Sequence, residues 1–248
     1  MKEAEEEFLK YATPYEKYGE KIELKIKHTM RVKKISKDLA ESLNLSKEDV
    51  DLAEYCGLLH DVARFEQWKR YGTYDDLKSI DHGNLGYEIL KKDHFINRFT
   101  KKNHNTILLA VKYHNKYRVP NTLNERNRLF ANITRDADKL DILHLVINGK
   151  LAVKTDNTIM SNHIIKQLKN KTSIRTKDVK TKADEIGVRL GFIFDINFKK
   201  SYQMIKEHDY INRLIDCQKK ETKNEELVKQ MEELRTFVNE YIEEMITC

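Results

Sequence analysis

The chain contains 248 residues, of which 40% are hydrophobic and 35% are charged, compared with roughly 25% charged residues in an average globular domain. This length suits one large domain, or a core domain with additional segments. The formal net charge is +6, but basic and acidic residues are interspersed almost everywhere, which argues against a nucleic-acid-binding tract and favours small phosphorylated ligands.

The sequence predicts an all-α fold. Only 8 Gly and 2 Pro interrupt it, and the segments between them carry Leu, Ile and Val at helical rather than alternating spacing. A first long helix is predicted within residues 18–44, with Asn44 as its stop. Its apolar stripe consists of Ile22, Ile26, Met30 or Thr29, Val32, Ile35 and Leu39. Ser46 has an acidic residue three positions later, as in a capping box, and opens a second helix that runs to His60 and Asp61.

More helices are predicted beyond this pair. Residues 64–79 are expected to form a polar, aromatic connection, after which Asp81 caps the next helix. Apolar stripes predict helices within residues 103–117 and 124–150, the second closing at Gly149. Residues 150–182 predict a loose connection or a short helix, and two or three further helices are expected from residue 183 onward.

The Lys-rich run at residues 166–182 is expected to be solvated and mobile, with a lid or a phosphate-attracting role as the alternative. Nothing in the sequence indicates export or insertion into a membrane. The N-terminus is acidic and lacks an apolar core, and the longest apolar stretch, residues 107–111, is too short to cross a bilayer. The cysteines have no metal-binding spacing; they are Cys56, Cys217 and Cys248. We therefore expect a soluble protein of the reducing cytoplasm, with no membrane partner.

Ligand-type residues occur on several of the predicted helices, and these are the candidate metal ligands. They are His28, His60, Asp61, His82, His114 and Asp138. Imidazole and carboxylate groups suit Fe, Mn, Co or Zn ions, and metal sites in helical bundles are built from inward side chains on facing helices.

The adjacent His60 and Asp61 need their own explanation, because neighbouring side chains on a helix point about 100° apart. At the end of a helix, both side chains can reach one metal ion, or the carboxylate can bridge that ion to a second one. A bound ion would offset the desolvation that makes a buried carboxylate costly.

In their order and local context, these residues resemble the HD superfamily of metal-dependent phosphohydrolases, over roughly residues 20–148. The contexts are "HTMRV" around His28, "GLLHDVAR" around His60 and Asp61, and "DADKLDIL" around Asp138; they look like the family's "H..RV", "LLHD" and "ADKL" surroundings. The resemblance implies an HD-domain helical bundle with additional C-terminal helices. On this basis we expect an N-terminal helical extension (1–19), the HD metal-binding domain (20–150) and a helical C-terminal extension packed on that domain (151–248).

His82 in "HGNLG" and His114 in "VKYHN" resemble the additional metal ligands of the family's two-metal branch. That branch includes bacterial hydrolases of symmetrical diadenosine polyphosphates, whose overall pattern is the most similar, and the HD-GYP cyclic-dinucleotide phosphodiesterases. The chain lacks the Gly-Tyr-Pro motif of the HD-GYP group and has Asn115 where that group carries a second consecutive His. It also has Arg64 where the 5′-deoxynucleotidase branch has Glu, and it lacks the "HDxxED" pattern of alarmone hydrolases.

The resemblance implies a metal-dependent phosphohydrolase, either a phosphomonoesterase or a phosphodiesterase, that acts on a small nucleotide or related phosphate ester through metal-activated water. The cofactor would be one or two divalent transition-metal ions, Fe or Mn, with Co, Ni or Zn as alternatives; two ions would be bridged by Asp61. Asp61 would also orient or deprotonate the water. Arg64 would neutralise phosphate charge, with a surface ion pair as the alternative role for this residue. The alternative is a catalytically weak nucleotide-binding or signalling module. Nucleic-acid cleavage is disfavoured, because no continuous basic groove is indicated.

Other polar residues near these motifs allow two interpretations. Asp141 could accept a hydrogen bond from a ligand histidine or be solvated, Asp136 is the substitute ligand should Asp138 not bind metal, and Lys139 is a weaker candidate for phosphate contact. The remaining histidines are expected to be ordinary surface or core residues: His94, His104, His144, His163 and His208.

Overall fold

The computed structural model describes residues 1–153 and 157–247, and within these ranges every regular element is an α-helix or a 3-10 helix. The prediction of an all-α fold is therefore confirmed. The chain divides into two compact units, Met1–Asp138 and Lys139–Cys248, and the boundary lies within helix α7 (Glu125–Ile147). Among the described residues, no helix combines the length and apolarity needed to cross a bilayer.

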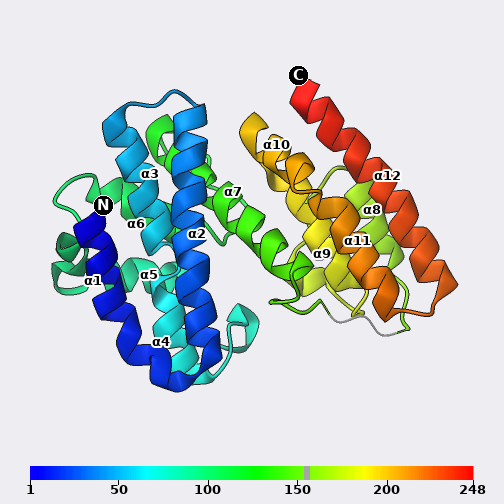
Figure 1. The fold of residues 1–248 in the computed structure, drawn as a ribbon, viewed down its shortest axis with the longest axis horizontal. Helices are drawn as coiled ribbons and strands as arrows, with labels where there is room; N and C mark the ends of the chain where they lie inside the picture. The colour runs from blue at the N-terminus through cyan, green and yellow to red at the C-terminus, as the bar shows by residue number, and fades with distance from the viewer. Residues whose placement is uncertain (154–156, 248) are drawn as a thin grey trace. The chain divides into compact units, whose positions relative to one another are not determined.

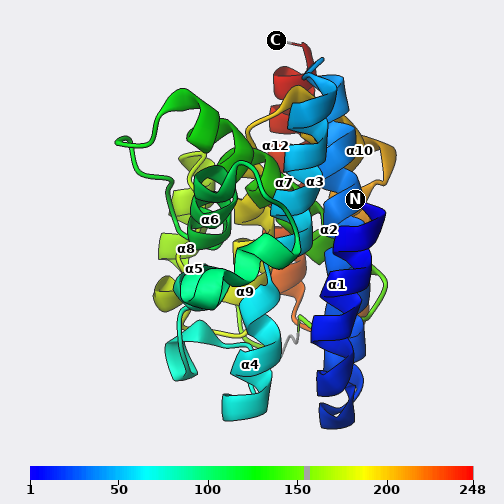
Figure 2. The same cartoon turned by 90° about the vertical axis from the view of Figure 1, so that its left-hand side faces the viewer.

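The first unit is a bundle in which α2 packs along α3, α5 packs along α6, and α4 contacts α5. Helices α2 and α3 lie side by side in both views (Figures 1 and 2). The elements are α1 (Lys2–Ala12), η1 (Thr13–Tyr18), α2 (Glu20–Ser42), α3 (Lys47–Leu59), α4 (Val62–Tyr71), η2 (Asp76–Lys78), α5 (His82–Lys91), η3 (Lys92–Arg98), α6 (His104–Tyr113) and the first part of α7.

The stripe predicted on α2 is buried only in part. Ile22, Val32 and Leu39 have no exposed surface, whereas Ile26 and Ile35 are partly exposed. Because α2 packs along α3, part of the core of the first unit lies between these two helices.

The predicted signals at the junction of α2 and α3 are confirmed. Asn44 adopts a left-handed φ of 53° just beyond the end of α2, a conformation that Asn tolerates better than most residues. The Ser46 side chain accepts a hydrogen bond from the backbone N–H of Asp49 at 3.2 Å and caps α3.

The prediction of a connection over residues 64–79 is wrong in its first half, because residues 62–71 form helix α4. Phe65 is fully buried, and its ring lies 5.7 Å from that of Phe8 and 5.8 Å from that of Tyr11, both on α1. Phe65 therefore belongs to a packing face between α4 and α1 and not to a connection. Gly72 then ends α4 with a left-handed φ of 62°.

The helices that follow begin and end near their predicted signals. Asp81 Oδ1 accepts the backbone N–H of Asn84 at 2.8 Å, which confirms the cap of α5. Helix α6 is shorter than the predicted segment and ends at Tyr113. Gly149, with a φ of 65°, follows the end of α7 as predicted.

The second unit also consists of helices. They are the last part of α7, α8 (Asn162–Lys169), η4 (Thr176–Asp178), α9 (Asp184–Gly191), η5 (Phe192–Asp195), α10 (Lys199–Glu207), α11 (Tyr210–Glu221) and α12 (Glu225–Thr247). The expected two or three helices after residue 183 are thus an underestimate, because α9, α10, α11 and α12 are separate α-helices. The count was too low because α9 and α10 are short and are separated by a 3-10 turn.

The Lys-rich run at residues 166–182 is attached to the second unit. Leu168 is fully buried and Ile174 is nearly so, and the Lys171 ammonium lies 2.8 Å from Glu244 on α12. Its apolar residues therefore contribute to the core, whereas the expectation was a solvated and mobile run. A loose connection or a short helix was the prediction for residues 150–182, and α8 is a short helix within that range. Residues 154–156 of the same range lie outside the described residues.

Candidate metal centre

His60 and Asp61 lie at a break between two helices. Helix α3 ends at Leu59, and Asp61, with φ −104° and ψ 18°, departs from helical geometry before α4 begins at Val62. His60 Nε2 and Asp61 Oδ2 are 3.5 Å apart, and the two residues are 0% and 2% exposed. The break therefore allows two consecutive polar side chains to share one buried region.

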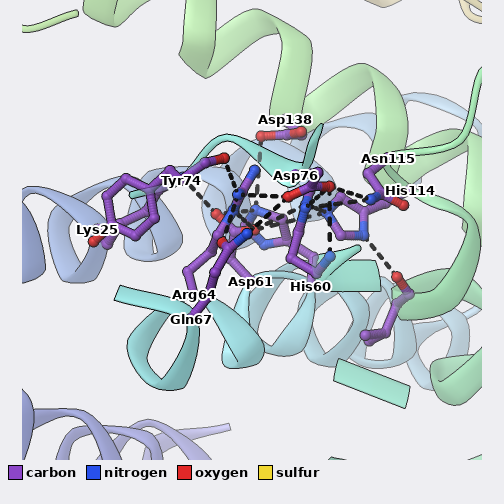
Figure 3. A network of polar contacts seen from close by, with 12 residues as sticks. Lys25, His60, Asp61, Arg64, Gln67, Tyr74, Asp76, His114, Asn115 and Asp138 are labelled. Atoms are coloured by element: carbon purple, nitrogen blue, oxygen red, sulfur yellow. Dashed lines mark hydrogen bonds and ion pairs between the residues drawn. The ribbon is translucent and has the colours of Figure 1, made fainter. Parts of the chain in front are cut away.

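The first cluster is defined here as His28, His60, Asp61 and Asp138. Asp61 belongs to it through Oδ2. Asp61 Oδ2 lies 3.4 Å from His28 Nε2. Asp138 Oδ1 lies 3.2 Å from His28 Nε2 and 3.7 Å from His60 Nε2, and the two Nε2 atoms are 3.2 Å apart. Donor atoms from α2, α7 and the α3–α4 junction thus converge within the reach of one ion (Figure 3).

The second cluster is defined as Asp61, His82 and His114. Asp61 belongs to it through Oδ1. The distances from this oxygen are 3.5 Å to His82 Nε2 and 3.7 Å to His114 Nε2. The two Nε2 atoms are 2.9 Å apart. His82 begins α5 and His114 directly follows α6. The fold therefore brings all the predicted metal ligands together, with the two oxygens of Asp61 divided between two groups.

The imidazole rings are oriented for metal binding. His60 Nδ1 lies 2.8 Å from the carbonyl oxygen of Gly57, and His114 Nδ1 lies 2.7 Å from that of Val111. Because a carbonyl can only accept, each Nδ1 carries the proton and each Nε2 presents a lone pair. Close lone pairs repel each other unless a cation lies between them, so this donor set fits a divalent ion.

Glycine allows α5 to approach α6 closely at the second cluster. A Cβ atom on Gly83 would lie 2.4 Å from Asn115 Oδ1 and 2.8 Å from the carbonyl oxygen of Lys112. One on Gly86 would lie 2.8 Å from Val111 Cγ1. The glycines of "HGNLG" are therefore needed for the contact that places His82 beside His114.

Both carboxylates of the first cluster are ionised. Burial by itself would raise the pKa of Asp61, but Lys25, His60 and Arg64 outweigh this effect and hold the pKa well below its usual range. Burial also acts to raise the pKa of Asp138, and the two histidines of its cluster lower it well below the usual range. The site therefore presents anionic oxygens, as metal binding requires.

Burial shifts two histidines of the site, His60 and His82, toward the neutral form. Burial lowers the pKa of His60. It also lowers the pKa of His82 to about 3, with the positive charge of Arg64 as a further cause. Neutral imidazoles are the form that binds a metal ion.

Two cations lie beside Asp61. The Lys25 ammonium is 2.7 Å from Asp61 Oδ2, and the Arg64 Nε donates to Asp61 Oδ1 at 3.3 Å. The Tyr74 ring lies close to both cations, with its centroid 5.3 Å from Lys25 Nζ and 5.5 Å from Arg64 Cζ. Arg64 NH1 donates to the Tyr74 carbonyl oxygen, Gln67 and Asp76. The guanidinium is therefore fixed in position next to the donor atoms of the second cluster.

Sequence reasoning missed three residues at this site. Lys25 lies three residues before His28 on α2, and this helical spacing was a usable signal. Arg135, three residues before Asp138 on α7, donates from NH1 to the carbonyl oxygens of Tyr113 at 3.0 Å and His114 at 3.2 Å; its spacing was also a signal. Asp76 carried no signal, because the three-residue 3-10 turn η2 is too short to show a periodic pattern.

The weaker candidates of the sequence lie elsewhere or have other contacts. Lys139 pairs with Asp195 at 2.9 Å within the second unit. Among the described residues, the groups whose donor atoms lie close enough to hold one ion are His28, His60 and Asp138, and His60, Asp61 and His114. His82 adjoins the second group through its distances to Asp61 and His114. Asp136 and Asp141 are buried on α7 and belong to neither group. The histidines expected to be ordinary are also absent from those groups: His94, His104, His144, His163 and His208.

Comparison with known proteins gives one match. Residues 26–143 match the family model described as the HD domain. This range includes every member of both clusters. No curated protein and no solved structure matches the chain at a significant level.

Proposed function

Because residues 26–143 match the HD-domain family model, we propose that the chain is a member of the HD superfamily of metal-dependent phosphohydrolases and that it hydrolyses a small nucleotide or related phosphate ester with divalent metal ions. The observation that carries the proposal is the position of Asp61 between the two clusters. Its oxygens face separate sets of histidines, and a bridging carboxylate of this kind suits two ions that keep open positions for water and phosphate.

We assign one ion to each cluster. His28, His60, Asp138 and Asp61 Oδ2 would hold the first, and His82, His114 and Asp61 Oδ1 the second, as the distances among these atoms suggest. Fe or Mn suits this set of nitrogen and oxygen donors best, with Co, Ni or Zn as alternatives. Ions bound there supply a Lewis acid for a phosphoryl oxygen and lower the pKa of a bound water.

The remaining groups at the site act on water and phosphate. As an oxygen ligand beside the attacking water, Asp61 would help to orient or deprotonate it. Lys25 and Arg64 place two positive charges beside Asp61, where they offset the charge that develops on the phosphate. Because Arg64 already uses Nε and NH1 within the protein, its contact with phosphate is assigned to NH2.

The same proposal includes the class of substrate, the division into domains and the cellular location. Cations at the site and mixed charge elsewhere favour a compact phosphorylated molecule over a nucleic acid. The division into an N-terminal extension (1–19), an HD domain (20–150) and a C-terminal extension packed on it (151–248) stays a prediction. So does a location in the cytoplasm.

The test is elemental analysis of protein purified without chelator, followed by a panel of nucleotides and phosphate esters with added Mn or Fe. The proposal expects bound transition metal and turnover of at least one phosphate ester. Metal binding and tight nucleotide binding without turnover would instead support the signalling module. Absence of bound metal after reconstitution would reject the proposal.

A further inference from the structure

The carboxylate of Asp76 makes several polar contacts beside the second cluster. It begins the short turn η2 between α4 and α5. Asp76 Oδ2 lies 2.6 Å from His82 Nδ1 and accepts from Asn115 Nδ2 at 3.1 Å. Asp76 Oδ1 accepts from Gln67 Nε2 at 2.9 Å and from Arg64 NH1 at 3.1 Å. Figure 3 shows Asp76 between Arg64 and Asn115.

These contacts engage both oxygens of the carboxylate. Oδ1 is held by two residues of α4, and Oδ2 by the first residue of α5 and the segment after α6. All of the partners that are not histidine are donors, so Asp76 serves as an acceptor at both oxygens. The proton on the bond to His82 therefore lies on Nδ1, and His82 Nε2 presents a lone pair toward Asp61 and His114.

The group that accepts from Nδ1 of His82 is of a different kind from those that accept from two other histidines of the site. His60 and His114 are oriented by backbone carbonyl oxygens, those of Gly57 and Val111. No side-chain substitution removes those acceptors. His82 is oriented by a side-chain carboxylate, so its orientation depends on the identity of residue 76.

We propose that Asp76 is a positioning residue for the second ion: it sets the tautomer and ring angle of His82 and thereby controls occupancy at Asp61 Oδ1, His82 and His114. This inference rests on the proposed function, because it assumes that the second cluster binds metal. A carboxylate behind a ligand imidazole also increases the basicity of the nitrogen that binds the metal. The first cluster has no contact with Asp76 of this kind, so its ion is expected to be unaffected.

The test is Asp76→Asn, with Asp75→Asn as the matched control. An amide has one accepting atom, whereas both oxygens of Asp76 accept, so the substitution breaks contacts in either orientation. Asp75 caps the backbone N–H of Leu77 at 3.0 Å, a role that Asn can fill. Mn²⁺ titration followed by calorimetry should show the first equivalent unchanged and the second weakened about 10- to 100-fold. The control should bind both equivalents normally.

A second readout needs no metal. Imidazole ¹⁵N NMR of chelator-treated protein should show His82 protonated on Nδ1 in the wild type and partly on Nε2 in Asp76→Asn. In the His82→Ala background, Asp76→Asn should cause no further loss of Mn²⁺ binding, because the two residues act through one contact. This comparison separates positioning from a general loss of folding.

The outcomes distinguish this inference from the function on which it rests. Two equivalents of unchanged affinity together with an unchanged His82 tautomer in Asp76→Asn would overturn the role of Asp76 and leave the metal site intact. Equal weakening of both equivalents would also overturn it. If the wild type binds only one equivalent of metal, there is no second ion and the role of Asp76 is wrong. If the wild type binds no metal, the proposed function itself is wrong.

Discussion

The Lys25 ammonium forms a 2.7 Å ion pair with Asp61 Oδ2, the oxygen that faces His28 and His60. An ion bound in the first cluster would take that oxygen, so the ammonium would be released toward the substrate. Lys25→Met should therefore leave metal content unchanged but lower kcat/KM by about 1.5–3 kcal/mol, the range for a hydrogen bond to a charged group. Steady-state kinetics with metal analysis checks this. Lys27→Met, which removes an exposed lysine of the same helix, is the control, and an equal effect in both variants would contradict a specific role.

The first cluster should be required for metal binding. Replacement of His60, Asp61 or Asp138 by Ala should remove most bound metal and nearly all turnover, because these donors come from different elements and converge on one ion. Elemental analysis of the purified variants measures this. His104→Ala, at the start of α6 and bonded to the Thr100 carbonyl oxygen, should behave as the wild type. Full occupancy and wild-type rate in Asp138→Ala would move the assignment to Asp136.

The second cluster predicts the number of ions. The wild type should bind close to two equivalents of iron or manganese, since two open sites about 3.5–4 Å apart suit phosphoryl transfer. His82→Ala and His114→Ala should each reduce this to about one equivalent. Saturation of the wild type at one equivalent, with both variants unaffected, would leave a mononuclear site and make these two histidines contacts for substrate.

Arg64 is expected to act on substrate. Arg64→Ala should retain the first ion and lower kcat/KM by about 1.5–3 kcal/mol, because a charge-assisted contact with phosphate is lost. Arg64→Lys should not restore the rate, since a lysine cannot bond Asp61 and Tyr74 and still reach the phosphate. Kinetics of the two variants, with metal content measured in parallel, tests this; an unchanged rate in Arg64→Ala would limit the residue to its contacts within the protein.

Metal-free protein should lose stability as the pH falls. Burial lowers the pKa of His60, and lowers that of His82 to about 3 from an ordinary 6.5. The unfolded chain then binds protons that the folded chain does not, so the stabilisation is complete above about pH 6.5 and decreases below it. Asp61 and Asp138, whose pKa values lie well below 3.8, add a further loss below about pH 4.

Urea unfolding of chelator-treated protein at about pH 7.5 and about pH 5 measures this dependence. His82→Gln should show a smaller loss of unfolding free energy between the two conditions, because it lacks one of the buried imidazoles. Equal stability of the wild type at both values would contradict the prediction.

The sequence alone determined the helical class and many helix ends. Caps and stops such as Ser46, Asp81 and Gly149 act on backbone groups within a few residues, so their effect is readable locally. The order of His28, His60–Asp61 and Asp138 also indicated the family, which the match over residues 26–143 bears out. The contact of α4 with α1 was missed, because Phe65 and Tyr11 meet only after folding.

Only the tertiary structure decided how the site is divided and supported. The sequence does not show which oxygen of Asp61 faces which histidines, because that depends on the backbone break at residue 61 and on the approach of α5 to α6. Asp76 begins the three-residue turn η2, which is too short for a periodic pattern, and its contacts with Gln67 of α4 and His82 of α5 form only when the chain folds. Local patterns report on neighbours in the chain; the supporting contacts join residues that only the fold brings together.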